Sequence, residues 1–252
     1  MTSRRYPLAT SLEGKKLLAV TAHPDDDMGM GSVLTHYAAR GVRVHLVCAT
    51  PGQKGFRTHT GITDPVELAA VRREELRRVC EILRIEPPML LDFVDKEVLG
   101  PQQGDLRNRL QEILLRLRPD VVLSFGPDGI TGHPDHRGIS CLVTELLQKE
   151  ERSDVRLYFL VFTAAMARRL FQATGRELAW VADRFLNTVI EVTDEELNRS
   201  LEAISQYKSQ FAPDAMQQLL DFHRQSGRKI YFRRALQVVE PGSPIHSCLF
   251  GD

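Results

Sequence analysis

The sequence lacks a surplus of either charge and has no long apolar run. Lys and Arg together number 33, Asp and Glu also number 33, and the formal net charge is zero. Binding along a nucleic acid backbone needs a basic surplus, so we expect no nucleic acid partner. No apolar run approaches the roughly 20 residues of a membrane span, and residues 1–16 lack the apolar segment of a signal peptide. We therefore expect no membrane span and no secretory leader.

Cysteine is also scarce, with four residues, at positions 48, 80, 141 and 248. No two of them form a CxxC pair, and their spacing fits no zinc-ribbon pattern. Three lie in apolar runs, where cysteine usually acts as a small buried hydrophobic residue. Because disulfides accumulate in oxidising compartments, we expect reduced thiols and a cytoplasmic location.

Apolar runs alternate with amphipathic stretches along the first two thirds of the chain. The expected strands are 16–21, 42–49, 89–94, 120–125 and 156–162. The expected helices between them are 29–40, 65–84, 102–118 and 135–150. This alternation indicates βαβ units and a parallel sheet. With right-handed crossovers it predicts an α/β, Rossmann-like, doubly wound, mostly parallel sheet, in which a strand order of 3-2-1-4-5 would make the first and fourth strands neighbours.

The alternation loosens after residue 163. We expect a strand at 188–192, a helix over 194–211 that begins with a capping box in TDEE, a helix near 214–226 and a strand near 229–234. No linker, repeat or block of charge divides the chain. We therefore expect residues 1–252 to form a single domain.

Two similar polar motifs follow the first and fourth predicted strands. Residues 22–27 read AHPDDD, and residues 132–136 read GHPDH. In open α/β sheets, ligands bind beyond the carboxyl ends of the strands, at the point where the strand order reverses. Imidazoles and carboxylates there form a ligand set for a first-row metal, and two His with one carboxylate is a common arrangement in catalytic zinc sites.

A simpler interpretation of each motif is a helix N-cap, in which an aspartate accepts backbone N–H bonds and the histidine lies at the surface. Either motif alone is compatible with that interpretation. Two such motifs at the ends of adjacent strands favour a functional site, because a packed apolar core needs no such concentration of carboxylates.

The predicted helix over 65–84 carries a further signal. Arg72 and Glu75 fall within its apolar stripe, whereas its other arginines fall outside. A buried arginine needs a partner, which could be Glu75 in an i,i+3 ion pair or a polar group of a substrate. Asp95, just after the third strand, is similarly either a ligand for a substrate hydroxyl or an ordinary loop carboxylate.

The AHPDDD and GHPDH motifs resemble the paired signatures of the LmbE-like, or PIG-L-type, N-acetylglucosaminyl deacetylases, which include zinc-dependent enzymes. The segment RREEL at 72–76 resembles the R-x-x-E-L helix of that family, and YKSQ at 207–210 resembles its late Y-x-S-Q segment. Asp95 also has a counterpart in many members. The resemblance covers residues 16 to 210 and implies a zinc-dependent removal of acetate from an N-acetylated sugar.

The resemblance also implies roles for individual residues. The implied zinc ligands are His23, Asp26 and His136. Asp25 would be the general base, His133 would stabilise the oxyanion or protonate the leaving amine, and Asp135 would hold the His133 imidazole. Amide hydrolysis suits these residue types, because a metal activates water, a free carboxylate takes its proton and an imidazole can return one to the amine.

Several features leave the substrate open. Asp27 stands where the family usually has Glu, Thr131 where some members have Tyr, and Asn198 where Lys is common. The role of the polar loop 52–64 is also open, as are the choice between zinc and Fe(II) and the existence of a homo-oligomer that completes the crevice.

Other functions remain as alternatives to the deacetylase. One is a zinc amidase that cleaves a larger N-acyl conjugate. Another is a non-catalytic ligand-binding protein, which is disfavoured because a binder would not need the free carboxylate of Asp25. A nucleotide-binding module is disfavoured because no GxGxxG follows the first strand.

Overall fold

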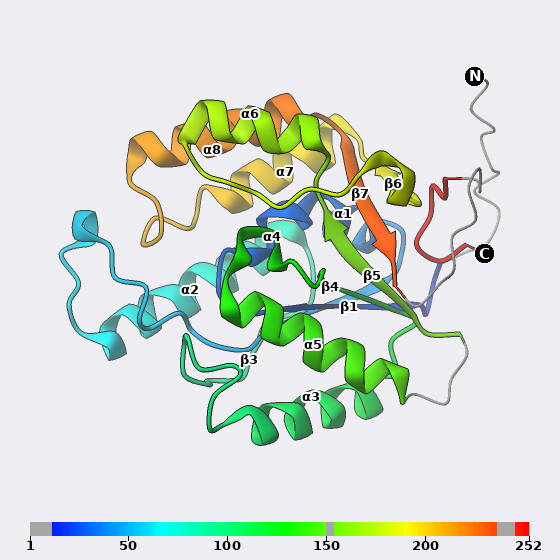
Figure 1. The fold of residues 1–252 in the computed structure, drawn as a ribbon, viewed down its shortest axis with the longest axis horizontal. Coiled ribbons are helices and arrows are strands. Elements are labelled where there is room, and N and C mark those ends of the chain that lie inside the picture. Colours follow the sequence, from blue (N-terminus) through cyan, green and yellow to red (C-terminus); the bar gives the residue numbers. More distant parts are fainter. Residues whose placement is uncertain (1–11, 150–153, 236–244, 252) are drawn as a thin grey trace.

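A seven-stranded sheet forms the centre of the structure, in the order β3-β2-β1-β4-β5-β7-β6 (Figure 1). The structure is a computed structural model that describes residues 12–149, 154–235 and 245–251. Residues 1–11, on which most of the leader expectation rests, lie outside the described ranges. The strands are β1 (Lys16–Thr21), β2 (Arg43–Cys48), β3 (Met89–Leu90), β4 (Val121–Phe125), β5 (Arg156–Val161), β6 (Thr188–Glu191) and β7 (Lys229–Arg234).

The pairing of the strands confirms the predicted α/β, Rossmann-like fold. Strands β1 to β5 are parallel and follow the expected order, so that β1 and β4 are neighbours. Strand β7 pairs antiparallel with both β5 and β6 and extends the sheet at one edge. The sequences of β1 and β4 are almost wholly apolar because both faces of these central strands are covered.

Helices cover both faces of the sheet. They are α1 (Gly31–Ala38), α2 (Pro65–Leu83), α3 (Gln103–Leu117), α4 (Gly129–Gly132), α5 (Pro134–Gln148), α6 (Ala164–Thr174), α7 (Asp194–Ile204) and α8 (Pro213–Ser226). Helices α3 and α5 lie together on one side, and α1 and α7 lie on the other, with α6 and α8 packed side by side above them (Figure 1). None of the helices in the described ranges is both long and apolar enough to cross a membrane.

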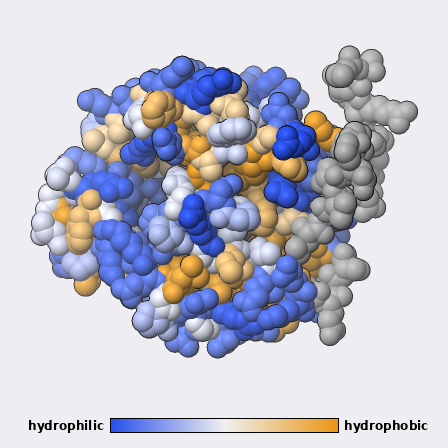
Figure 2. All heavy atoms as spheres, viewed as in Figure 1, coloured by the Kyte–Doolittle hydropathy of each residue, from blue (hydrophilic) through white to orange (hydrophobic). Residues whose placement is uncertain are grey.

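Polar and charged side chains cover most of the face that Figure 2 presents, whereas apolar residues gather in its middle, beneath α6. Helix α6 was not expected from the sequence, and it supplies part of this region. Helix α4, a four-residue turn between β4 and α5, is likewise not among the expected helices.

Several predicted elements are shorter in the structure. The third strand is confined to Met89–Leu90, and the predicted helix 29–40 is shortened to α1, with a 3₁₀ turn, Asp26–Gly29, before it. The predicted helix 194–211 ends at Ile204, and turns follow it. These turns bury both Tyr207 and Ser209, whereas a continued helix would place the two side chains on different faces.

Two hydrogen-bonded contacts fix the segment after α7. The Ser209 backbone N–H and its hydroxyl donate to the two oxygens of the Glu75 carboxylate, at 2.7 and 2.6 Å. The buried Tyr207 hydroxyl donates to the carboxylate of Asp27. The YKSQ segment therefore connects α2 to the loop after β1.

Replacing Glu75 by Ala should lower the free energy of unfolding by about 2 kcal/mol, because the buried N–H of Ser209 loses its acceptor. Glu74→Ala is the matched control on the same helix. Its carboxylate pairs with Arg77 and Arg78 at the surface, where ion pairs contribute little. Urea unfolding monitored by circular dichroism measures both variants, and equal midpoints would contradict this view of the segment.

Candidate active site

The two histidine-containing motifs meet at the carboxyl ends of β1 and β4. His23 follows β1, Asp26 begins the 3₁₀ turn after it, and His136 lies in the first turn of α5. Pro134 occupies the start of α5, where a missing N–H costs no helical hydrogen bond. The strand order thus brings together residues that are more than a hundred positions apart.

Three of the predicted site residues converge on one point. His136 Nε2 lies 3.0 Å from Asp26 Oδ1 and 3.3 Å from His23 Nδ1, and His23 Nδ1 lies 3.4 Å from Asp26 Oδ2. Ligands about 2.1 Å from a tetrahedral ion are themselves separated by about 3.4 Å. The spacing of the three groups therefore suits one divalent metal ion.

His133 lies beside this triangle. Its ring centroid is 4.8 Å from that of His23, and one ring nitrogen from each of His23, His133 and His136 falls within a common 4.8 Å. The Asp26 triangle, with sides of 3.0 to 3.4 Å, is the tighter set. Its dimensions leave His133 next to the metal position rather than within the closest set of ligands.

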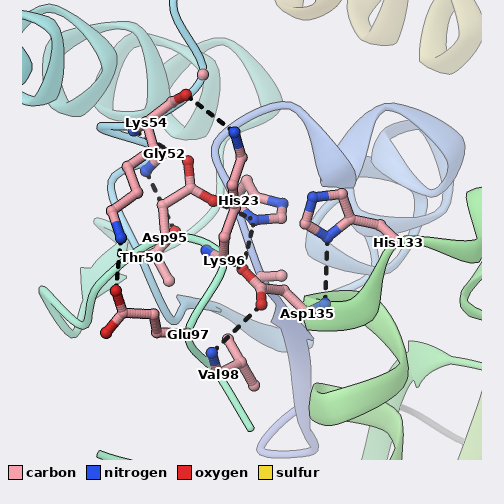
Figure 3. A network of polar contacts seen from close by, with 12 residues as sticks. His23, Thr50, Gly52, Lys54, Asp95, Lys96, Glu97, Val98, His133 and Asp135 are labelled. Atoms are coloured by element: carbon pink, nitrogen blue, oxygen red, sulfur yellow. Dashed lines mark hydrogen bonds and ion pairs between the residues drawn. The ribbon is translucent and has the colours of Figure 1, made fainter. Parts of the chain in front are cut away.

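Hydrogen bonds fix the orientation of both histidines in the triangle. His23 Nε2 lies 3.1 Å from Asp95 Oδ1 and 3.1 Å from Asp135 Oδ2 (Figure 3), and His136 Nδ1 lies 2.9 Å from the carbonyl oxygen of Gly129. Carboxylates and carbonyls only accept, so the proton of each neutral ring is held on these outer nitrogens. The lone pairs of the other nitrogens then face the centre of the triangle, as metal ligation requires.

Asp26 is held by the backbone of its own turn. Its Oδ2 accepts hydrogen bonds from the N–H groups of Ala22 and His23, at 3.1 and 2.7 Å. Burial alone would raise the pKa of Asp26, but the neighbouring His136 and His23 lower it well below its usual value. The group is therefore an ionised carboxylate fixed in place.

Asp25 differs from Asp26 in conformation and surroundings. Its φ of 107° lies in a region that residues with a side chain rarely adopt, and such strain is concentrated at functional sites. Its side chain borders a cavity, and no described residue donates a hydrogen bond to its carboxylate. Burial and the adjacent Asp26 raise the pKa of this carboxyl. Asp25 is thus a carboxylate free to accept a proton from a molecule in the cavity.

The expected contact between Asp135 and the His133 imidazole is wrong. The Asp135 carboxylate instead accepts from His23 Nε2 and from the backbone N–H groups of Lys96 and Val98, at 2.6 and 3.3 Å (Figure 3). His133 caps α5, and its Nδ1 accepts from the Asp135 backbone N–H at 3.1 Å. The neutral His133 ring therefore carries its proton on Nε2. Adjacent residues at a helix start point in different directions, which explains the failed prediction.

Asp95 also holds His23. Besides its contact with His23 Nε2, it accepts from the backbone N–H of Lys54 at 3.1 Å, and only 3% of the residue is exposed. It borders the cavity as well, but the two contacts give it a structural partner on each oxygen. The expectation of a direct bond to substrate remains a prediction.

The ion pair between Arg72 and Glu75, one of the two partners that the sequence allowed for Arg72, does not form. The buried Arg72 guanidinium donates instead to the carbonyl oxygens of Gly52 and Gly55, and Glu75 accepts from Ser209. A Cβ at Gly52 would lie 2.1 Å from Arg72 Nη1, and the φ of Gly52 is +69°. Arg72 thus fixes the polar loop 52–64, while its side chain also borders the cavity.

The loop 52–64 and the segment after α7 form one side of the cavity. Arg57 Nε donates to the carbonyl oxygen of Gln210 at 3.2 Å, and His59 Nε2 lies 2.9 Å from that of Lys208. The helix expected over 194–211 gives Tyr207 and Gln210 no role, because both would lie off the apolar stripe of a continuous helix. The YKSQ motif itself was the signal that could have placed them.

Two of the three departures from the family pattern, Asp27 and Thr131, lie at the site. Asp27 meets the hydroxyl of Tyr207, so the shorter side chain still has a buried partner. Thr131 Oγ1 lies 3.3 Å from His136 Nδ1 and borders the cavity. Both residues therefore support the site rather than interrupt it.

The triangle opens into a cavity of about 700 Å³. The polar groups at its base are His23, Asp25, Asp26, Arg72, Asp95, His133 and His136. A pair of histidines that could hold a metal, a free carboxylate and an imidazole N–H within one cavity are groups that suit hydrolysis of an amide or ester.

Comparison with known proteins agrees with this geometry. Residues 18–147, just over half of the chain, match the family described as PIG-L: GlcNAc-PI de-N-acetylase. The diacetylchitobiose deacetylase of Thermococcus kodakarensis is 29% identical over 253 residues, which cover 94% of this chain and 87% of the relative.

Solved structures share the fold. The N,N'-diacetylchitobiose deacetylase of Pyrococcus horikoshii superposes with a TM-score of 0.70 at 24% identity, over 91% of this chain and 87% of that one. GalB, the 4-carboxy-2-hydroxymuconate hydratase of Pseudomonas putida, superposes with a TM-score of 0.66 at 17% identity, over 91% and 99%. With both motifs gathered at one site and the profile matched across them, the chain belongs to the PIG-L, or GlcNAc-PI de-N-acetylase, family.

Proposed function

We propose that this protein is a zinc-dependent hydrolase that removes the acetyl group from an N-acetylglucosamine-type sugar. The observation that carries the proposal is the triangle of His23, Asp26 and His136, whose sides are 3.0 to 3.4 Å, with the free carboxylate of Asp25 beside it. The relative from Thermococcus kodakarensis is named for an N-acetylated sugar substrate, which supports the choice of substrate. A hydratase shares the fold, so the proposal rests on the site and not on the architecture.

His23 Nδ1, His136 Nε2 and a carboxylate oxygen of Asp26 would hold the metal. A bound divalent ion supplies Lewis acidity, which lowers the pKa of water and polarises an amide carbonyl. Two nitrogens and one oxygen suit zinc, and the same set also accepts Fe(II), so metal supply decides between them.

The residues of the chain move the protons. The Asp25 carboxylate accepts a proton from the attacking water, because it borders the cavity and no described group donates to it. His133 Nε2–H donates a hydrogen bond to the carbonyl oxygen and stabilises the negative charge that develops there. The proton taken up by Asp25 passes to the departing nitrogen as the C–N bond breaks, so that the amine leaves and acetic acid, which ionises to acetate, keeps the oxygen of water.

Removal of the metal should abolish activity. Purified protein should contain about one divalent ion per chain, and a chelator should stop acetate release from N-acetylglucosamine and diacetylchitobiose until zinc or Fe(II) is restored. Acetate release and metal analysis on the same samples provide the test. Full activity in metal-free protein would rule out the proposal.

Substitutions of the two adjacent aspartates should affect kcat and metal content differently. Asp25→Asn keeps the shape of the side chain but removes the base, so we expect it to retain the metal and lose kcat by roughly 10²–10⁴-fold. Asp26→Ala removes a ligand, so we expect low metal content and activity that responds to added zinc. Metal content beside kcat distinguishes them, and the reverse pattern would exchange the two roles.

The carboxylates behind His23 should control metal affinity. Asp95→Ala and Asp135→Ala each remove an acceptor from His23 Nε2, so we expect metal affinity to fall by roughly 10–100-fold while excess zinc restores kcat. Glu97→Ala is the control, because Glu97 pairs with Lys54 on the same group of loops and touches no metal ligand. Competition with a chelating dye measures affinity, and unchanged values in both aspartate variants would contradict the argument.

A further inference from the structure

The cavity above the metal position has two unlike parts. Its base carries the charged and metal-binding groups described above. Its upper part, which we call the apolar lobe, is formed by side chains from β5, α6, α8 and the turn before α8. These are Leu160, Phe162, Leu170, Phe211, Leu219 and Phe222.

The whole cavity is larger than one sugar ring requires. Its volume is about 700 Å³, in the upper half of the about 300–1,000 Å³ that is usual for sites that enclose drug-sized ligands. A hexosamine is a small ligand by that measure. The apolar lobe therefore offers space beyond a single N-acetylated sugar whose acetamido group reaches the metal position.

We propose that the apolar lobe binds an apolar aglycone, an alkyl or aryl group attached to the N-acetylated sugar. The inference rests on the proposed function, because the position of the acetamido group at the triangle sets where the rest of the substrate lies. The lobe and the triangle belong to one continuous cavity. A substituent on the sugar can thus enter the lobe without leaving the site.

The walls of the lobe are suited to apolar groups. None of its six side chains is more than 9% exposed, so they present an enclosed apolar surface rather than part of the protein exterior. Displacement of water from such a surface by an alkyl or aryl group is favourable.

The titratable residue of the lobe does not introduce charge. His223 of α8 borders both the lobe and a neighbouring small cavity, and burial lowers its pKa to about 4. Its imidazole is therefore neutral at pH 7. The charged residues Arg176 and Glu177 also line the cavity but are exposed, and the Arg176 guanidinium lies 5.3 Å from the ring centroid of Phe211. Charge thus lies at the exposed edge of the lobe.

The inner wall has space behind it. A second cavity of about 30 Å³ shares Leu160, Phe162, Phe222 and His223 with the lobe. That volume is about the share of one water molecule in the liquid. The four shared side chains therefore separate the lobe from this second, small space.

A series of n-alkyl N-acetylglucosaminides, from methyl through butyl to hexyl and in both anomers, tests the inference. We expect kcat/KM for amine release by the zinc-loaded enzyme to rise by roughly two- to four-fold for each added methylene, in the anomer that reaches the lobe. Calorimetric titration with the corresponding deacetylated glycosides gives a second measurement that does not need turnover. The hexyl compound should bind more tightly than the methyl compound.

A matched pair of variants on α8 locates the effect. Ala215 borders the cavity, so Ala215→Trp should fill part of the lobe and reduce the hexyl-to-methyl ratio of kcat/KM at least ten-fold. Gln217 is exposed on the same helix and is not among the residues that line the cavity. Gln217→Trp adds the same side chain and should leave the ratio as it is in the wild type.

The outcomes separate this inference from the proposed function. Hydrolysis of every glycoside at equal kcat/KM would overturn the lobe assignment and leave the deacetylase proposal intact. Tighter binding of the hexyl compound that Ala215→Trp abolishes, without hydrolysis of any member, would support the lobe and reject the deacetylase. Faster cleavage of N-hexanoylglucosamine than of the hexyl glycoside would place the acyl chain in the lobe and overturn the aglycone assignment.

Discussion

The contact of one imidazole nitrogen with two carboxylates determines the geometry of the whole site. His23 Nε2 lies 3.1 Å from both Asp95 and Asp135, which fixes the proton on that nitrogen and directs the lone pair of Nδ1 toward Asp26 and His136. His23 follows β1, Asp95 follows β3, and Asp135 lies in the first turn of α5. The ligand set can therefore assemble only after the strands of the sheet have paired in their native order.

The sequence was sufficient to predict the parts of the fold that depend on local pattern. The apolar strands 16–21 and 156–161 and the long amphipathic helix α2 were all evident from periodicity. Helix α6 was not, and the helix after Thr193 was predicted too long, because the turn that buries Tyr207 and Ser209 depends on partners in the loop after β1 and in α2. Such long-range contacts leave no periodic signal.

In the site, too, local motifs predict where residues lie, whereas they do not predict contacts with residues that are distant in the sequence. The motifs at 22–27 and 132–136 predict that His23, Asp26 and His136 lie together, because the strands that precede them are neighbours in the 3-2-1-4-5 order of a doubly wound sheet. The resemblance placed Asp135 against the His133 imidazole, and the sequence allowed an ion pair between Arg72 and Glu75, but neither contact forms. At the start of a helix, the direction in which a side chain points decides which group it contacts. The Asp135 carboxylate points toward His23 and the backbone N–H of Lys96 rather than toward the adjacent His133.

The backbone at Asp25 has a consequence for how such sequences diverge. A φ of 107° is costly for any residue with a Cβ, and glycine would adopt it without strain. Stability alone therefore favours glycine at position 25, and the proposed role of the Asp25 carboxylate as a base opposes it. In a lineage that kept this fold after the reaction ceased to matter, position 25 is where we would look first for drift, and a retained aspartate there marks a chain still under selection for chemistry.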